Sequence, residues 1–135
     1  MTRVYVLDAS ALVAYANGEP GGEIVESLLD DLDAICYAHA VNLCEVYYGV
    51  LRATDERTAR QVIADLRAAG VIERRDMSRR FWSMVGRLKS RGGISLADCF
   101  CVALAQRLSG EAVTADHREF DPLVPLGICP ILFIR

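Results

Sequence analysis

Four carboxylates in the sequence are placed where they could together bind a divalent metal ion. Asp8 and Asp116 each follow a short apolar run of strand character, and the carboxyl ends of parallel strands meet at one edge of a sheet. Glu45 and Asp98 lie in segments of helical pattern. Carboxylates about 4 Å apart repel each other by about 4 kcal/mol at an effective dielectric constant of about 20, so a cluster needs a cation or a proton. Oxygen ligands without His or Cys favour Mg²⁺ or Mn²⁺, which can bind a phosphodiester and activate water.

Three of these acids also have a structural interpretation. Asp8 could cap the helix that follows it, a task that Ser10 could also perform. The run Ser95-Leu-Ala-Asp98 fits a capping box at the start of a helix. Asp116 could be an ordinary turn aspartate. The functional interpretation therefore depends on the acids meeting in one place.

Glu45 interrupts an apolar helical segment. It shares one helical face with Asn42 and Gly49, at spacings of i, i+3 and i+7. An acid among core residues is costly unless it is paired, bound to a metal or able to reach solvent. Glu45 is therefore either part of a site or a residue at the edge of the core.

The hydrophobic pattern predicts strands that alternate with helices. Short apolar runs indicate the strands, and apolar residues at helical spacing indicate the helices. This alternation predicts a single α/β domain over residues 1–135, with helices on both faces of a mainly parallel sheet. The predicted strands are residues 4–7, 34–38, 71–73, 112–114 and 131–134. One predicted helix begins near Ser10, and the others cover about residues 24–32, 40–52, 55–69, 81–88 and 95–108.

Composition favours a folded protein of a reducing compartment. Hydrophobic residues make up 53% of the chain and charged residues 24%, which excludes an intrinsically disordered protein. The cysteines number five and include no CxxC pair, so reduced thiols are expected rather than disulfides or a structural zinc site. No segment resembles a signal peptide or a membrane span. We therefore expect a cytoplasmic protein that does not enter a membrane.

Positive charge is concentrated in the middle of the chain. The net charge is −3, but residues 52–91 contain 11 of the 15 basic residues and five acidic ones, which gives +6 there and −9 elsewhere. This basic segment either presents a surface to phosphate groups or consists of solvated helix faces.

Other classes of protein also place acids at strand ends. A phosphoacceptor signalling domain would need a lysine near a late strand, and the single lysine, Lys89, falls in a predicted helix. A phosphatase of the haloacid-dehalogenase type would need an aspartate two residues after Asp8, where Ser10 stands. A nuclease of the ribonuclease H type would begin with antiparallel hairpins, whereas this chain is predicted to form a helix directly after its first strand.

His117 could contact a phosphate, but a turn role is expected for His117 and for Asp121.

Taken in series, the acid-containing segments resemble the motifs of PIN-domain nucleases, and the likeness extends to the VapC-type toxins of bacterial toxin–antitoxin pairs. The resemblance covers essentially the whole chain. It implies a three-layer α/β/α fold, a sheet in strand order 3-2-1-4-5 and a metal-dependent endoribonuclease. The matching segments are Asp8-Ala-Ser10-Ala, Glu45 with Gly49, Ser95-Leu-Ala-Asp98 and Thr114-Ala-Asp116 with Phe120.

The resemblance also implies roles for individual residues. Mg²⁺ or Mn²⁺ would be bound by Asp8, Asp98 and Asp116, and Glu45 would complete the catalytic set. Ser10 and Thr114 match hydroxyl positions that would orient ligands or water, and Asn42 matches a residue common just before the family's glutamate.

The resemblance implies an RNA substrate, a cognate antitoxin that inhibits the enzyme, and a homodimer. RNA would be held mainly through its phosphates by the basic segment. The alternatives are a housekeeping nuclease of the same family and a module that binds RNA or a protein without cleaving. The candidate RNA-binding residues are Arg74, Arg75, Arg79, Arg80 and Arg87.

Overall fold

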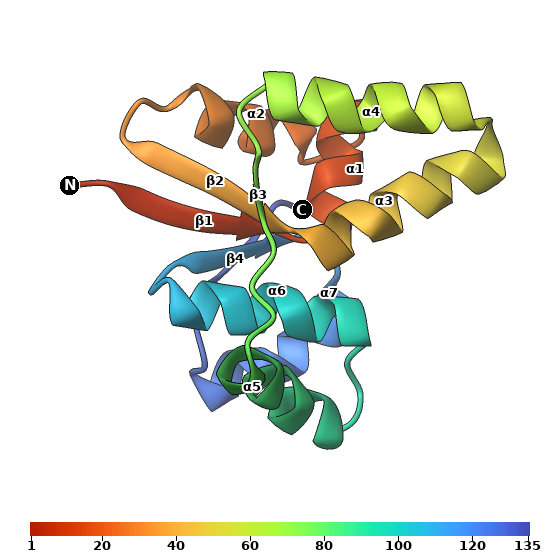
Figure 1. The fold of residues 1–135 in the computed structure, drawn as a ribbon. Coiled ribbons are helices and arrows are strands. Elements are labelled where there is room, and N and C mark those ends of the chain that lie inside the picture. The colour runs from red at the N-terminus through yellow and green to blue at the C-terminus, as the bar shows by residue number, and fades with distance from the viewer.

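A computed structural model describes all residues, 1–135, and its centre is a five-stranded sheet (Figure 1). The strand order is β3-β2-β1-β4-β5, and every neighbouring pair is parallel. The predicted strand order is therefore confirmed. The strands are β1 (Arg3–Leu7), β2 (Ala34–His39), β3 (Ile72–Arg74), β4 (Glu111–Thr114) and β5 (Ile131–Phe133).

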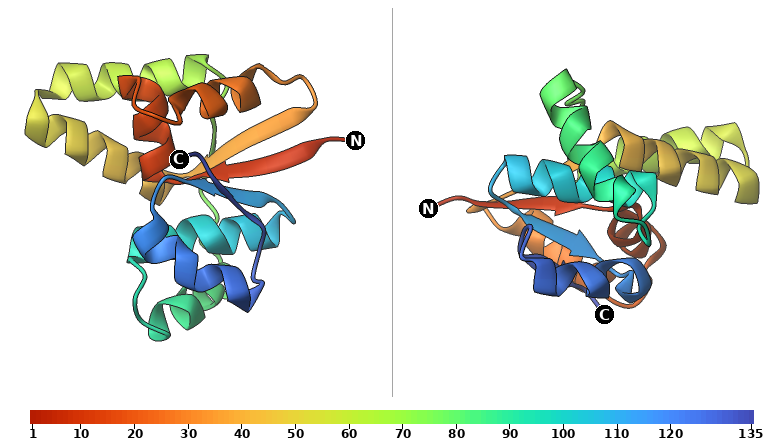
Figure 2. Two further views of the ribbon diagram at one scale, coloured as in Figure 1. Left: turned by 180° about the vertical axis from the view of Figure 1, so that it is seen from behind. Right: turned by 90° about the horizontal axis from the view of Figure 1, so that it is seen from below.

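Helices cover both faces of this sheet and complete the predicted three-layer α/β/α fold (Figures 1 and 2). Successive residues of β1 face opposite layers, as a strand requires. One layer holds α1 (Ala9–Asn17), α2 (Gly22–Asp30), α3 (Ala40–Ala53) and α4 (Glu56–Ala68); the other holds α5 (Arg79–Ser90), α6 (Leu96–Arg107), α7 (His117–Phe120) and the 3₁₀ helix Asp121–Leu126. Val6 packs in the core under α5 and α6, whereas Tyr5 and Leu7 pack in the core under α1, α2 and α3.

Two local details go beyond the sequence prediction. Asp55, and not the preceding Thr54, is the N-cap of α4 and accepts a hydrogen bond from the Thr58 amide at 2.7 Å. The Thr54 hydroxyl instead donates to the Val50 carbonyl at the end of α3. Helix α7 and the 3₁₀ helix were not predicted, because elements of four and six residues are too short to show a hydrophobic period.

All five cysteines are free thiols. Cys36, Cys99 and Cys101 are buried, Cys129 is partly buried, and Cys44 on α3 is exposed. Burial raises the pKa of the Cys36 and Cys129 thiols to about 11 and raises that of the Cys101 thiol well above its usual value. None of the helices combines the length and the hydropathy that a membrane-spanning segment needs.

Two helical glycines should respond in opposite ways to alanine. A Cβ on Gly22 would lie 2.5 Å from the Ala14 carbonyl oxygen of α1, whereas a Cβ on Gly86 of α5 would meet nothing within 4 Å. We expect Gly22→Ala to destabilise the protein by about 1–3 kcal/mol through overpacking. Gly86→Ala should stabilise it by about 0.5–1 kcal/mol through helix propensity. Urea unfolding of both variants measures this, and a similar effect of the two would contradict the close approach of α1 and α2.

Candidate functional site

One cavity at the carboxyl edge of the sheet contains the side chains of all four acids expected from the sequence. Its volume is about 700 Å³. Asp8 follows β1 and Asp116 follows β4, while Glu45 comes from α3 and Asp98 from the first turn of α6. Strand ends and helices from both layers therefore contribute to one acidic cavity.

Asp8 is the most deeply buried of these acids, with 1% of its surface exposed. Its Oδ1 accepts hydrogen bonds from the Ser10 hydroxyl at 2.7 Å and from the Ala11 amide at 2.9 Å, and the latter bond caps α1. Its Oδ2 accepts a hydrogen bond from the Thr114 hydroxyl at 2.5 Å. Burial raises the pKa of Asp8 to about 6, and Asp116 adds to the rise, while these hydrogen bonds oppose it.

The hydroxyls of Ser10 and Thr114 connect Asp8 to the segment that holds Asp116. Thr114 Oγ1 accepts a hydrogen bond from the Asp116 amide at 2.9 Å and donates to Asp8. Ser10 Oγ accepts one from the Ala115 amide at 2.9 Å and also donates to Asp8. Each hydroxyl therefore fixes both the Asp8 carboxylate and the backbone after β4.

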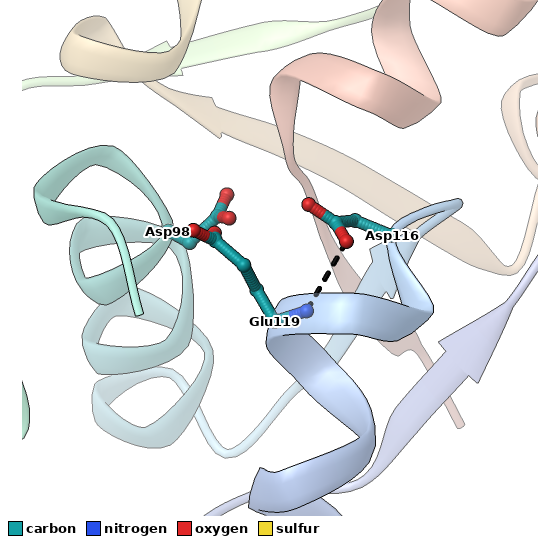
Figure 3. A group of neighbouring side chains, drawn as sticks. All are labelled: Asp98, Asp116 and Glu119. Carbon is teal, nitrogen blue, oxygen red and sulfur yellow. Dashed lines mark hydrogen bonds between the residues drawn. The ribbon is translucent and has the colours of Figure 1, made fainter. Parts of the chain in front are cut away.

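Asp98, Asp116 and Glu119 form the tightest group of acids in the cavity (Figure 3). One carboxylate oxygen from each lies within 4.8 Å of the other two. Asp116 caps α7 by accepting a hydrogen bond from the Glu119 amide at 3.1 Å, and Glu119 Oε1 accepts one from the Ser95 amide at 3.0 Å. Glu119 thus joins the N-terminus of α6 to α7 while its carboxylate faces the other two acids.

Sequence reasoning did not select Glu119. A signal was present, because Asp116-His-Arg-Glu119 has the same spacing as the capping box Ser95-Leu-Ala-Asp98. Its meaning depended on α7, a helix of only four residues. The place of Glu119 in the cavity therefore became apparent only in three dimensions.

Glu45 and Asn42 face different surroundings, although they lie one turn apart on α3. Glu45 is half-buried in the cavity wall, and its pKa is raised by burial and then by the charges of Glu119 and Asp116. Asn42 is fully buried and donates a hydrogen bond to the Ala97 carbonyl at 3.0 Å. Asn42 therefore lies behind the cavity wall.

The donor set fits a hard divalent cation. Asp98, Asp116 and Glu119 offer closely spaced oxygens. Asp8 Oδ1 already accepts two hydrogen bonds, but Oδ2 accepts only one and retains a lone pair. Since every candidate ligand is a carboxylate, the arrangement suits Mg²⁺ or Mn²⁺ better than zinc.

The cavity contains one basic side chain, Arg135, which donates hydrogen bonds to Glu19 at 3.3 Å and to the Pro20 carbonyl at 2.8 Å. In Figure 2 (left) this end of the chain lies beside α1. None of the five arginines expected to bind RNA lines the cavity. Arg74 pairs with Asp76, and Arg75 pairs with Glu73.

The half-exposed side chain of His117 makes three structural contacts. It pairs with Asp121 at 2.9 Å, lies 2.6 Å from the Arg135 carbonyl oxygen and stacks on Phe133 with ring centroids 4.2 Å apart. His117 begins α7 and Asp121 begins the 3₁₀ helix, so neither lies in the plain turn that was expected, and these contacts hold the end of β5 against α7.

Comparison with known proteins identifies the family. A search of curated proteins gives no match. Similar solved structures include a chain of VapBC2 from Rickettsia felis bound to a promoter DNA fragment (17% identity, 95% of this chain and 96% of that chain, TM-score 0.72). Others are DNA-bound VapBC from Salmonella typhimurium (15%, 100% of each chain, 0.72) and VapC20, a sarcin–ricin-loop-cleaving toxin from Mycobacterium tuberculosis (15%, 87% and 94%, 0.65). At identities this low, the structural similarity shows a shared fold.

The sequence model of the PIN domain matches residues 5–123. Because that match covers most of the chain, this protein belongs to the PIN domain family.

Proposed function

We propose that the protein is a metal-dependent endoribonuclease that hydrolyses RNA phosphodiester bonds. The observation that carries this proposal is the convergence of Asp8, Glu45, Asp98, Asp116 and Glu119 on one cavity. Such a concentration of like charge is unfavourable in an empty pocket and favourable around a divalent cation that binds a phosphodiester.

Four of these five acids are placed to bind the metal ion. Asp8, Asp98, Asp116 and Glu119 would hold the metal, with Asp8 oriented by Ser10 and Thr114. Bound Mg²⁺ or Mn²⁺ would supply Lewis acidity toward the phosphate and lower the pKa of a bound water.

Glu45 has the properties of a proton acceptor rather than a ligand. It is half-buried in the cavity wall and, unlike those of Asp8, Asp116 and Glu119, its carboxylate accepts no hydrogen bond. Its raised pKa brings its basicity closer to neutral pH, where a general base is most effective. We propose that Glu45 accepts the proton of the attacking water.

We propose further that the protein is the toxin of a toxin–antitoxin pair. The support is the fold that this chain shares with chains of VapBC complexes, which are less than 25% identical to it in sequence. The cavity continues from the acids along an apolar wall of α1, α3 and α4. An amphipathic antitoxin segment could pack on this wall and place an arginine among the acids. The wall is formed by Val13, Val46, Gly49, Val50, Ala53 and Val62.

The ion pairs reduce the number of arginines that we propose to bind RNA. Arg79, Arg80 and Arg87 of α5 are exposed and have no ion pair, whereas Arg74 and Arg75 are already paired. The α5 arginines are therefore better placed to bind phosphates outside the cavity. A homodimer and a cytoplasmic location remain predictions of the family resemblance.

RNA cleavage should require a divalent metal ion. We expect no cleavage in EDTA and recovery with Mg²⁺ or Mn²⁺. Asp8→Asn and Asp116→Asn should each lower kcat by at least about a hundredfold, because several kcal/mol of charge stabilisation are lost at about 1.4 kcal/mol per tenfold in rate. Asp33→Asn, in an exposed turn, is the matched control and should cleave normally. A metal-free wild-type enzyme that cleaves RNA would refute the proposed chemistry, as would full activity of both variants.

Without metal, Asp8→Asn should stabilise the protein at neutral pH. The folded-state pKa of about 6 lies above the unfolded value of 3.8. Below pH 3.8 Asp8 is protonated in both states and costs no stability. As pH rises from 3.8 toward 6 the free energy of unfolding falls, because the folded state resists ionisation of Asp8, and it stays lower above pH 6. Asparagine removes this cost, so the gain should be small at pH 4 and about 1–2 kcal/mol at pH 7, less than the full shift at 1.36 kcal/mol per unit because asparagine makes weaker hydrogen bonds.

Asp55→Asn is the contrasting control for this measurement in EDTA. Asp55 also caps a helix, but it is exposed and its pKa is lowered by the Thr58 amide. This substitution should therefore lower stability at pH 7. If Asp8→Asn were also destabilising at pH 7, burial would not raise the pKa of Asp8 as described.

A toxin must harm the cell that makes it unless a partner inhibits it. We expect expression of this chain in a bacterial host to arrest growth, and the Asp116→Asn variant at the same level to leave growth normal. Co-expression of the product of the neighbouring gene should restore growth. Growth curves with matched immunoblots measure this, and an equal arrest by wild type and Asp116→Asn would show that nuclease activity is not the cause.

A further inference from the structure

Helices α3 and α6 are joined by a single side-chain hydrogen bond. Asn42, with none of its surface exposed, donates from Nδ2 to the Ala97 carbonyl at 3.0 Å. Helix α3 belongs to the layer that packs on Leu7, and α6 belongs to the layer that packs on Val6. The hydrogen bond therefore links the two helical layers beyond the edge of the sheet.

The other half of the same amide has no partner. Asn42 Oδ1 is buried and accepts no hydrogen bond. Leaving a buried acceptor unpaired costs about 1–3 kcal/mol, and replacing a polar pair with apolar groups of similar shape can be neutral or stabilising. A leucine at this position would avoid that cost. Stability alone therefore gives no reason for asparagine here.

The hydrogen bond lies next to two acids of the cavity. Asn42 precedes Glu45 by three residues on one face of α3, and Ala97 immediately precedes Asp98 in the first turn of α6. The Glu45 carboxylate has no hydrogen bond or ion pair to another residue, whereas Asp8, Asp116 and Glu119 each accept at least one hydrogen bond. The position of Glu45 relative to Asp98 therefore depends on how α3 docks against α6.

We propose that Asn42 is a positioning residue that sets the separation of Glu45 from Asp98 by clamping α3 to α6. The inference rests on the proposed nuclease function, in which Glu45 accepts a proton. The amide acts through helix docking and does not touch the substrate. Its directional hydrogen bond fixes the register of the two helices, which apolar packing alone would leave free to slide.

Two substitutions separate positioning from stability. Asn42→Leu removes both the donor and the unpaired acceptor, so its free energy of unfolding should equal or exceed that of the wild type. Asn42→Ala leaves a cavity and should lower it. Both should lower kcat by about tenfold to a hundredfold, the penalty expected for a displacement of about 1 Å, with KM for RNA little changed. Leu43→Val, at the next buried position of α3, is the control and should lose stability without losing kcat.

A double-mutant cycle tests whether Asn42 acts through Glu45. In the Glu45→Gln background, Asn42→Leu should cause no further loss of kcat. The same loss in both backgrounds would overturn the proposal, as would a kcat that follows stability across the three single variants. If the wild type failed to cleave any RNA with metal present, the proposed function would fail instead.

Amide hydrogen exchange of the metal-free protein tests the clamp without catalysis. Asn42→Leu should accelerate exchange in the first turns of both α3 and α6, while exchange in α4, which carries no such bond to α6, stays unchanged. Unaltered exchange in α3 and α6 would show that the hydrogen bond does not hold the two helices together.

Discussion

Repulsion among carboxylates at one edge of a parallel sheet is the constraint that governs this structure. Six acids, Glu19 among them, line one cavity, and one of the six, Asp8, is almost completely buried. The fold accommodates this charge with hydrogen-bond donors from the backbone and from the hydroxyls of Ser10 and Thr114. The N-termini of α1, α6 and α7 all lie at the cavity, and amides there donate to the carboxylates of Asp8, Glu119 and Asp116. These helix starts also direct their positive dipole ends at the acids.

The same constraint explains why both helical layers are needed. Asp8 and Glu45 belong to elements of one layer, and Asp98 and Glu119 belong to the other. The parallel sheet brings the strand ends together, but each helix must also dock at the right height beside its neighbours. Hydrogen bonds join these elements: Thr114 links the end of β4 to Asp8, Glu119 links α7 to the start of α6, and Asn42 links α3 to α6.

The sequence was sufficient for the features that follow from strong local patterns. Apolar runs located the strands, and an acid directly after a strand places Asp8 and Asp116 at the carboxyl edge. The missing features depend on pairings between distant segments. Arg135 enters the cavity through the path of β5, and Arg74 and Arg75 are engaged by Asp76 and Glu73, none of which follows from charge counting. Glu119 escaped notice because its helix is too short to be periodic.

The uneven burial of the cysteines provides a practical way to observe this cavity. Cys44 is the single exposed thiol and directly precedes Glu45 on α3. The other four are partly or fully buried with raised pKa values, so they form few of the thiolates that react with alkylating reagents. A maleimide fluorophore would therefore attach mainly at Cys44 in the unaltered chain. Its emission would report on α3 beside the acids as metal, RNA or a partner protein binds, without the need to engineer a labelling position.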